Sequence, residues 1–149
     1  MTGFEIADLL VASGIVTARP IILDDKYRLP DYSWVTSTFA SKLRKFQNDL
    51  HLNRWTEVSN DCDDFSEDAR FLMRKLHRNT HEGNQYGIAF GIIAYQADVE
   101  SPNKELGHEL NFFISIIDGK PTLNFFEPQT GLISNLSVKE RQNTYYYLV

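Results

Sequence analysis

The chain contains a single cysteine, Cys62, whose place in the sequence is suited to a nucleophile. The segment that begins at Ser59 starts with helix-capping residue types, so Cys62 is expected in the first turn of a helix. The unpaired N–H groups and partial positive charge of a helix N-terminus favour the thiolate. A lone cysteine can also be a small buried hydrophobic residue, and it cannot form an internal disulfide or a cysteine-rich zinc site.

Three carboxylates surround this cysteine, at Asp61, Asp63 and Asp64. Their negative charge favours the protonated thiol unless a cation or the helix dipole offsets it. Acidic residues are also common at helix N-termini because the dipole stabilises them there. Both interpretations of the acidic residues stay open at this point.

A cysteine nucleophile requires an imidazole as its base and a third group that orients the imidazole. Of the four histidines, His51, His77 and His81 lie at helix ends or in polar segments, where solvated side chains are expected. His108 differs because it opens a predicted strand directly after Gly107. His108 is therefore the candidate base.

The strands predicted over 108–117 and 122–127 form a hairpin. A turn of two or four residues would place Glu127 and Gln129 on the same face of the sheet as His108. Either side chain could then accept a hydrogen bond from the imidazole. A three-residue turn would put them on the opposite face.

The elements that must position these residues follow from hydrophobic periodicity. Helices are predicted over 3–13, from Asp31 or Ser33 to residue 50, and over 59–76, and strands over 86–97, 108–117, 122–127 and 144–149, with an edge strand or extended arm over 15–23. This order predicts an α+β fold in which N-terminal helices pack on a C-terminal antiparallel β-sheet. A length of 149 residues with 42% hydrophobic content suits one domain over residues 1–149.

Charge and hydropathy exclude several classes of protein. The 15 basic residues are fewer than the 20 acidic ones and look scattered along the chain, which argues against a nucleic-acid partner. No apolar run is long enough for a membrane span, and the N-terminus lacks the pattern of a signal peptide. We therefore expect a soluble, cytoplasmic protein with no membrane partner.

Four short motifs in order strengthen the case for cysteine chemistry. They are Asp24-x-x-Tyr27-x-x-Pro30, Asn60-Asp-Cys-Asp-Asp-Phe65, Gly107-His-Glu-Leu-Asn-Phe112 and Phe126-Glu-Pro-Gln-Thr-Gly131. With these motifs the chain resembles a papain-like cysteine peptidase family that includes the C-terminal peptidase domain of the Marasmius oreades agglutinin and small stand-alone bacterial and phage proteins. The motifs run from residue 24 to residue 131.

The resemblance implies a papain-like fold that hydrolyses peptide or protein substrates. It implies Cys62 as nucleophile, His108 as general base and then acid, and Glu127 as the carboxylate that orients His108. It also implies activation by calcium or manganese, for which the carboxylates of Asp61, Asp63 and Asp64 could be ligands. The chemistry itself requires no cofactor.

The sequence departs from the family pattern in two ways. Papain has a glutamine shortly before its cysteine that helps to bind the oxyanion, and residues 54–59 contain none. Backbone N–H groups at the helix start, helped by Asn60 or Gln47 and supported by Gln129, would have to replace it. The chain is also too short to hold a lectin domain in addition to the peptidase domain, so the resemblance to the agglutinin does not imply sugar binding.

Two other functions stay open. One is a peptidoglycan-cleaving amidase of the related papain-like kind, and the other is a binding or inhibitory module with an inactive site. The acidic residues beside Cys62 and the missing glutamine favour the second of these. Cleavage specificity and oligomeric state are not encoded in any readable motif.

Overall fold

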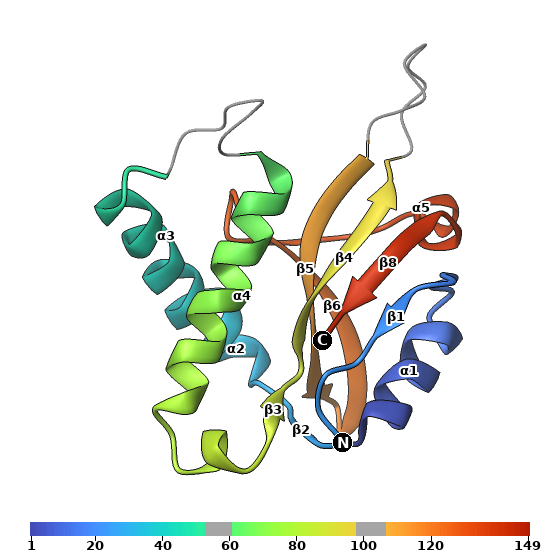
Figure 1. Cartoon of the computed structure of the whole chain (residues 1–149), viewed down its shortest axis with the longest axis horizontal. Helices are drawn as coiled ribbons and strands as arrows, with labels where there is room; N and C mark the ends of the chain where they lie inside the picture. Colours follow the sequence, from blue (N-terminus) through green and yellow to red (C-terminus); the bar gives the residue numbers. More distant parts are fainter. Residues whose placement is uncertain (53–60, 98–106) are drawn as a thin grey trace.

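The computed structural model describes residues 1–52, 61–97 and 107–149. Six strands form one twisted sheet in the order β1-β8-β4-β5-β6-β7 (Figure 1). Their bounds are Pro20–Ile21 (β1), Phe90–Gln96 (β4), Gly107–Ile117 (β5), Lys120–Glu127 (β6), Leu132–Ser134 (β7) and Thr144–Leu148 (β8). The sheet is antiparallel except where β1 pairs with β8.

The helices begin close to the predicted residues. They are α1 (Gly3–Ala12), α2 (Tyr32–Trp34), the π-helical turn η1 (Val35–Phe39), α3 (Ala40–Asp49), α4 (Cys62–Arg78) and α5 (Val138–Gln142), with a short 3₁₀ turn η2 (Glu82–Asn84). The helix predicted from residue 31 starts where Asp31 accepts a hydrogen bond from the Trp34 N–H at 2.7 Å, and it continues through α2, η1 and α3. The first residues predicted for the 59–76 helix, including Asn60, lie outside the described residues.

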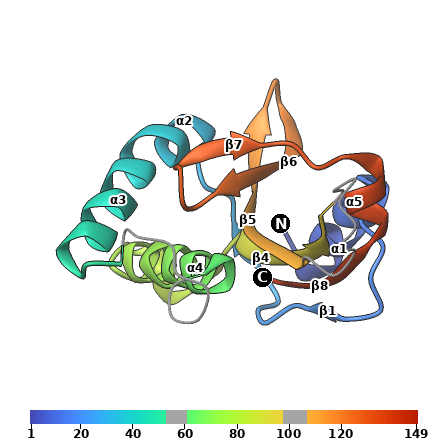
Figure 2. The ribbon, with the colours of Figure 1, turned by 90° about the horizontal axis from the view of Figure 1, so that it is seen from above.

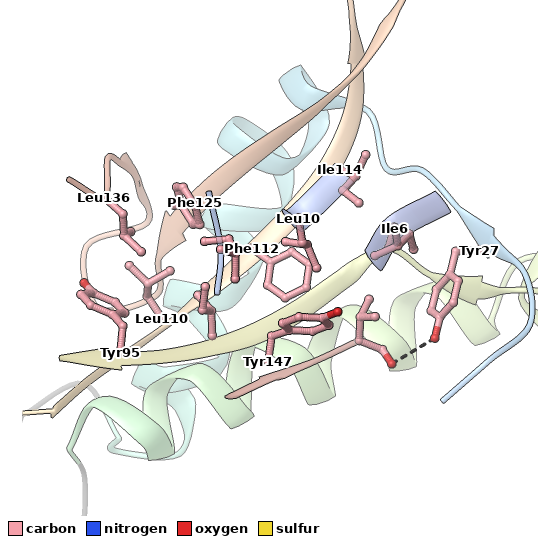
Figure 3. Packing of buried hydrophobic residues seen from close by; sticks show 14 residues of the cluster. Ile6, Leu10, Tyr27, Tyr95, Leu110, Phe112, Ile114, Phe125, Leu136 and Tyr147 are labelled. Carbon is pink, nitrogen blue, oxygen red and sulfur yellow. Dashed lines mark hydrogen bonds between the residues drawn. The ribbon is translucent and has the colours of Figure 1, made fainter. Parts of the chain in front are cut away.

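Two hydrophobic cores lie on the two faces of the sheet. On one face, Ile6 and Leu10 of α1 pack against Phe112 and Tyr147 (Figure 3). On the other face, α2, η1, α3 and α4 cover a cluster that includes Phe90, Phe113 and Phe126 (Figure 2). The α+β class is therefore confirmed, with helices on both faces and with a parallel pairing of β1 and β8 that the sequence analysis did not predict.

The hairpin of β5 and β6 has the two-residue turn that the site requires. Asp118 and Gly119 form this turn with φ angles of 51° and 75°, and Ile117 pairs with Lys120. Positive φ at both central positions is typical of the turn that matches strand twist, and Asp-Gly suits it. The register that follows places Glu127 on the face that carries His108.

The Asp24-x-x-Tyr27-x-x-Pro30 motif has a structural role. β2 (Tyr27–Arg28) pairs in parallel with β3 (Gly87–Ile88). The buried Tyr27 hydroxyl donates to the Val149 carbonyl at 3.0 Å and accepts from the backbone N–H groups of Leu23 and Asp24 (Figure 3). The motif thus joins the N-terminal segment to the last strand.

Within the part of the chain that the structure describes, no helix combines the length and the apolar character needed to cross a bilayer.

Candidate active site

Cys62 is the first residue of α4, and its side chain is half-buried. Asp61 caps the helix in a reciprocal arrangement with Asp64, in which the Asp61 N–H donates to Asp64 Oδ2 at 3.3 Å. The predicted position of the cysteine, in the first turn of a capped helix, is confirmed. The helix N-terminus therefore directs unpaired backbone N–H groups toward the surroundings of the thiol.

His108 interacts with both this cysteine and a carboxylate. Its Nε2 is 3.0 Å from Oε2 of Glu127, and its ring is also hydrogen-bonded to the side chain of Cys62. The side chains of His108 and Glu127 are only 30% and 19% exposed, so solvent screens this arrangement incompletely. The structure thus brings together the three side chains that the sequence analysis singled out.

The electrostatics of this arrangement favour an imidazolium. Hydrogen bonds to Cys62 and then to Glu127, with the charges of both, raise the pKa of His108 from 6.5 to about 10, although burial acts in the opposite direction. A protonated imidazole beside a sulfur stabilises the thiolate form of a nucleophile.

Both carboxylate oxygens of Glu127 have a partner, and the turn after β6 supplies one of them. Oε2 faces His108, and Oε1 accepts the backbone N–H of Gln129 at 3.2 Å. Gly131, with a φ of 72°, closes the turn by donating its N–H to the Glu127 carbonyl at 2.8 Å. Gln129 therefore contacts the carboxylate through its backbone, and its exposed side chain does not hydrogen-bond His108 within the described parts of the chain.

One side chain that contacts the histidine, Tyr95, was not identified from the sequence. The buried Tyr95 contacts the imidazole edge to face, with centroids 5.7 Å apart and an interplanar angle of 86°. Tyr95 faces His108 across the β4–β5 ladder, so cross-strand pairing is the signal that would have identified it.

A buried polar network fixes α4 to the sheet just behind the site. Ser66 of α4 and Tyr146 of β8 both donate hydroxyl hydrogen bonds to the carboxyl group of Glu109. Asn111 donates to the Ser66 carbonyl at 2.9 Å and to the Gly91 carbonyl at 3.1 Å. Because Glu109 directly follows His108, this network ties the helix of the nucleophile to the strand of the base.

The three acidic residues at the helix start fit a divalent cation. Ligand atoms of Asp61, Asp63 and Asp64 all lie within 4.8 Å of one another, and two oxygens on one calcium ion are at most about 5 Å apart. Oδ1 of Asp61 is buried and has no hydrogen-bond partner among the described residues. Asp61 and Asp64 also cap α4, so both roles considered for these residues are compatible with the structure.

The other candidate residues lie apart from this arrangement or outside the described residues. His77 hydrogen-bonds the Tyr86 carbonyl at 2.9 Å near the far end of α4, and His51 and His81 are exposed. Gln47 is buried on α3, where its Nε2 lacks a hydrogen-bond partner within the described ranges. Asn60 is outside those ranges. The oxyanion roles of Asn60, Gln47 and Gln129 stay predictions.

Comparison with known proteins gives similarity in structure only. No protein-family model matches the chain, and no curated protein sequence does. The structure of Polyporus squamosus lectin bound to the human-type influenza-binding epitope Neu5Aca2-6Galb1-4GlcNAc matches with a TM-score of 0.69 and 21% identity, over 100% of this chain and 49% of that one. A PSL1a–E64 complex matches with a TM-score of 0.67 and 19% identity, over 100% of this chain and 51% of that one. The chain therefore has the fold of about half of each of these longer proteins.

Proposed function

We propose that this chain is a papain-like cysteine peptidase or amidase that works through a thioester acyl-enzyme. The observation that carries the proposal is the placement of His108 in hydrogen-bonding contact with both the Cys62 thiol and the Glu127 carboxylate. A nucleophile, a base and an orienting acid in this order form the arrangement that acyl transfer requires.

The proposed reaction has two steps. The Cys62 thiolate attacks the carbonyl carbon of the substrate, and the proton on the His108 imidazolium passes to the leaving amine as the C–N bond breaks. Water then attacks the thioester, His108 takes a proton from that water, and the C–S bond breaks to release the acid.

Other groups would assist both steps. Glu127 would keep the imidazole oriented and stabilise its positive charge. The free N–H groups at the start of α4 would bind the oxyanion. A calcium or manganese ion held by Asp61, Asp63 and Asp64 would supply positive charge that offsets these carboxylates beside the thiol.

The test compares the wild-type chain with Cys62→Ala. Both are incubated with an unfolded protein substrate, with calcium, manganese or a chelator, and new N-termini are identified by mass spectrometry. We expect cleavage by the wild type and a loss of at least about a thousandfold in Cys62→Ala. Equal cleavage by the two chains would overturn the proposal.

Covalent labelling gives a second readout that needs no substrate. One similar structure is a complex with E64, and E64 is an epoxide that a thiolate can open. We expect E64 and iodoacetamide to modify Cys62 of the wild type rapidly, and to modify His108→Ala slowly. Slow labelling of both chains would favour the inactive binding module.

Purified cell wall distinguishes the amidase from the peptidase. Release of stem-peptide amines from peptidoglycan without cleavage of protein would assign the chain to the amidases. The glycan named for the lectin structure is bound by a chain about twice as long, and our proposal does not extend to it.

A further inference from the structure

Four basic side chains gather along one groove, although the whole chain carries a formal charge of -5. Arg70, Arg74, Lys75 and Arg78 of α4 line this basic groove, and Glu67 is the acidic residue that lines it with them. The expectation that basic residues are scattered is therefore wrong for α4, where a spacing of four residues puts three arginines on one side of the helix.

Within the described residues, the four cations have no ion-pair partner. None of them lies within 4.0 Å of a carboxylate among the described residues, and none takes part in the ion pairs Arg28–Glu82, Lys45–Asp49 and His108–Glu127. The helix dipole accounts for Lys75 and Arg78 in the last turn, but Arg70 and Arg74 come earlier.

Arg70 is partly buried. Its Nε is buried and has no hydrogen-bond partner in the described part of the chain. Burial and then the charge of Arg74 lower the pKa of Arg70, against the weaker opposing influence of Tyr27, Glu67 and Asp24. A partly buried guanidinium beside a second one is stabilised when an anion pairs with both.

The groove also has apolar walls. Phe71 of α4, which is 52% exposed, Ile92 of β4 and Leu148 of β8 also line it. Figure 1 shows α4 on one side of β4 and the end of β8 on the other. The groove therefore offers charged groups along the helix and apolar contacts along the sheet.

The spacing of the charges matches an extended peptide. Residues four apart on a helix are about 6 Å apart along its axis, and side chains on one face of an extended chain repeat every 6.6 Å or so. From Cys62, Arg70 lies about 12 Å and Arg78 about 24 Å along the helix, a distance that roughly four to seven extended residues cover.

We propose that the basic groove binds an acidic peptide segment whose alternate carboxylates pair with Arg70, Arg74 and Arg78. That the basic groove is a secondary contact for the substrate rests on the peptidase function proposed above. The binding of an acidic peptide to the groove does not depend on that function. The net negative charge of the chain opposes a longer polyanion such as nucleic acid.

The experiment measures binding in Cys62→Ala, so that turnover plays no part. A fluorescein-labelled peptide of alternating Glu and Ala is titrated by fluorescence anisotropy at two salt concentrations, with a Gln-for-Glu peptide of the same length as its neutral match. We expect the acidic peptide to bind at least about tenfold more tightly than the neutral one, with affinity that falls as salt rises.

Variants locate the binding. Arg74→Gln/Lys75→Gln should weaken it about tenfold, and Arg70→Gln should weaken it independently of that pair. The matched control, Lys42→Gln/Arg44→Gln, removes the same charge from exposed positions on α3 and should leave binding within about twofold. Thermal melting checks that each variant is folded. If either Arg70→Gln or the double variant does not fold, the other still tests the groove.

Three outcomes would overturn the inference. They are equal affinity for the acidic and neutral peptides, equal weakening by the groove and control variants, and tighter binding of a single-stranded oligonucleotide than of the peptide. If the chain cleaves peptides, the double variant should raise KM for acidic substrates and leave kcat and neutral substrates unchanged. If the chain binds the acidic peptide but cleaves no peptide, the proposed peptidase function is rejected and the proposed binding by the basic groove stands.

Discussion

His108 is the residue on which the candidate chemistry depends, because the side chains of Cys62 and Glu127 both interact with it. Its partners raise its pKa to about 10, so it carries a proton at neutral pH. A group with these properties can donate a proton to a leaving amine and later accept one from water. The other three histidines lack both partners in the described part of the chain.

The raised pKa makes a prediction about stability. Folding favours the protonated form of His108, so its stabilising effect is complete below about pH 6.5 and is lost as the pH rises through about 10. The difference in unfolding free energy between the wild type and His108→Gln should therefore be largest at pH 6. A loss of about 1 kcal/mol is reasonable there for a side chain that is partly screened by solvent.

Urea unfolding of both chains at pH 6, 8 and 10 checks this prediction. His77→Gln is the matched control, since its imidazole contacts a backbone carbonyl and no carboxylate within the described residues. A gap for His108→Gln that stays constant or widens toward pH 10 would contradict the assigned partners.

At the scale of elements, α4 and β5 must keep a fixed separation for Cys62 to reach His108. Ser66, Glu109 and Tyr146 connect α4, β5 and β8 through hydrogen bonds within the protein interior. Glu109 alternates with apolar residues along β5, a pattern that usually puts the polar residue on a solvent-exposed face. It is nevertheless only 5% exposed, because α4 covers this face of the strand.

Glu109→Gln should destabilise the protein by about 1 to 3 kcal/mol. The variant replaces one of the two acceptor oxygens with an NH2 donor and removes the negative charge, so at least one hydroxyl must reverse its hydrogen bond and both bonds lose their charge assistance. Urea unfolding measures the loss, and iodoacetamide labelling shows whether Cys62 also reacts more slowly. The control Asp8→Asn, on the exposed side of α1, removes the same charge and should change the stability little. Equal stability of the Glu109 variant and the wild type would show that the network does not fix α4.

At the scale of the whole molecule, one sheet is shared by two cores, and the two ends of the chain meet on it. β1 lies beside β8, and the Tyr27 hydroxyl binds the Val149 carbonyl. Since both cores depend on the same strands, a ligand that binds only the folded site at the start of α4 should stabilise the entire fold.

Calcium should therefore raise the melting temperature. A dissociation constant near 1 mM and 10 mM calcium would add about 1.4 kcal/mol, or about 3 °C for a domain of this size. Scanning calorimetry with calcium, with equal magnesium and with a chelator measures the shift, and Asp63→Asn should abolish it. An unchanged melting temperature, or an equal shift in the variant, would show that the carboxylates only cap the helix.

The sequence predicted most elements because their signals are local. The helix over 31–50 and the Asp118-Gly119 turn depend on capping, periodicity and positive-φ preference within a few residues. The same reasoning missed β7 and α5, which are short, and the parallel β1–β8 pair, which joins segments far apart in the chain.

By itself, the sequence determined the α+β class and the place of Cys62 in the first turn of a helix, and it put His108 and Glu127 on one face for a turn of two or four residues, because each follows from local preference or strand parity. Only the tertiary structure decided that Cys62 reaches His108, that Glu109 is buried under α4, and that three arginines line a groove against β4 and β8. These features depend on where α4 crosses the sheet, and that is set by side-chain packing between distant segments, which no local pattern encodes.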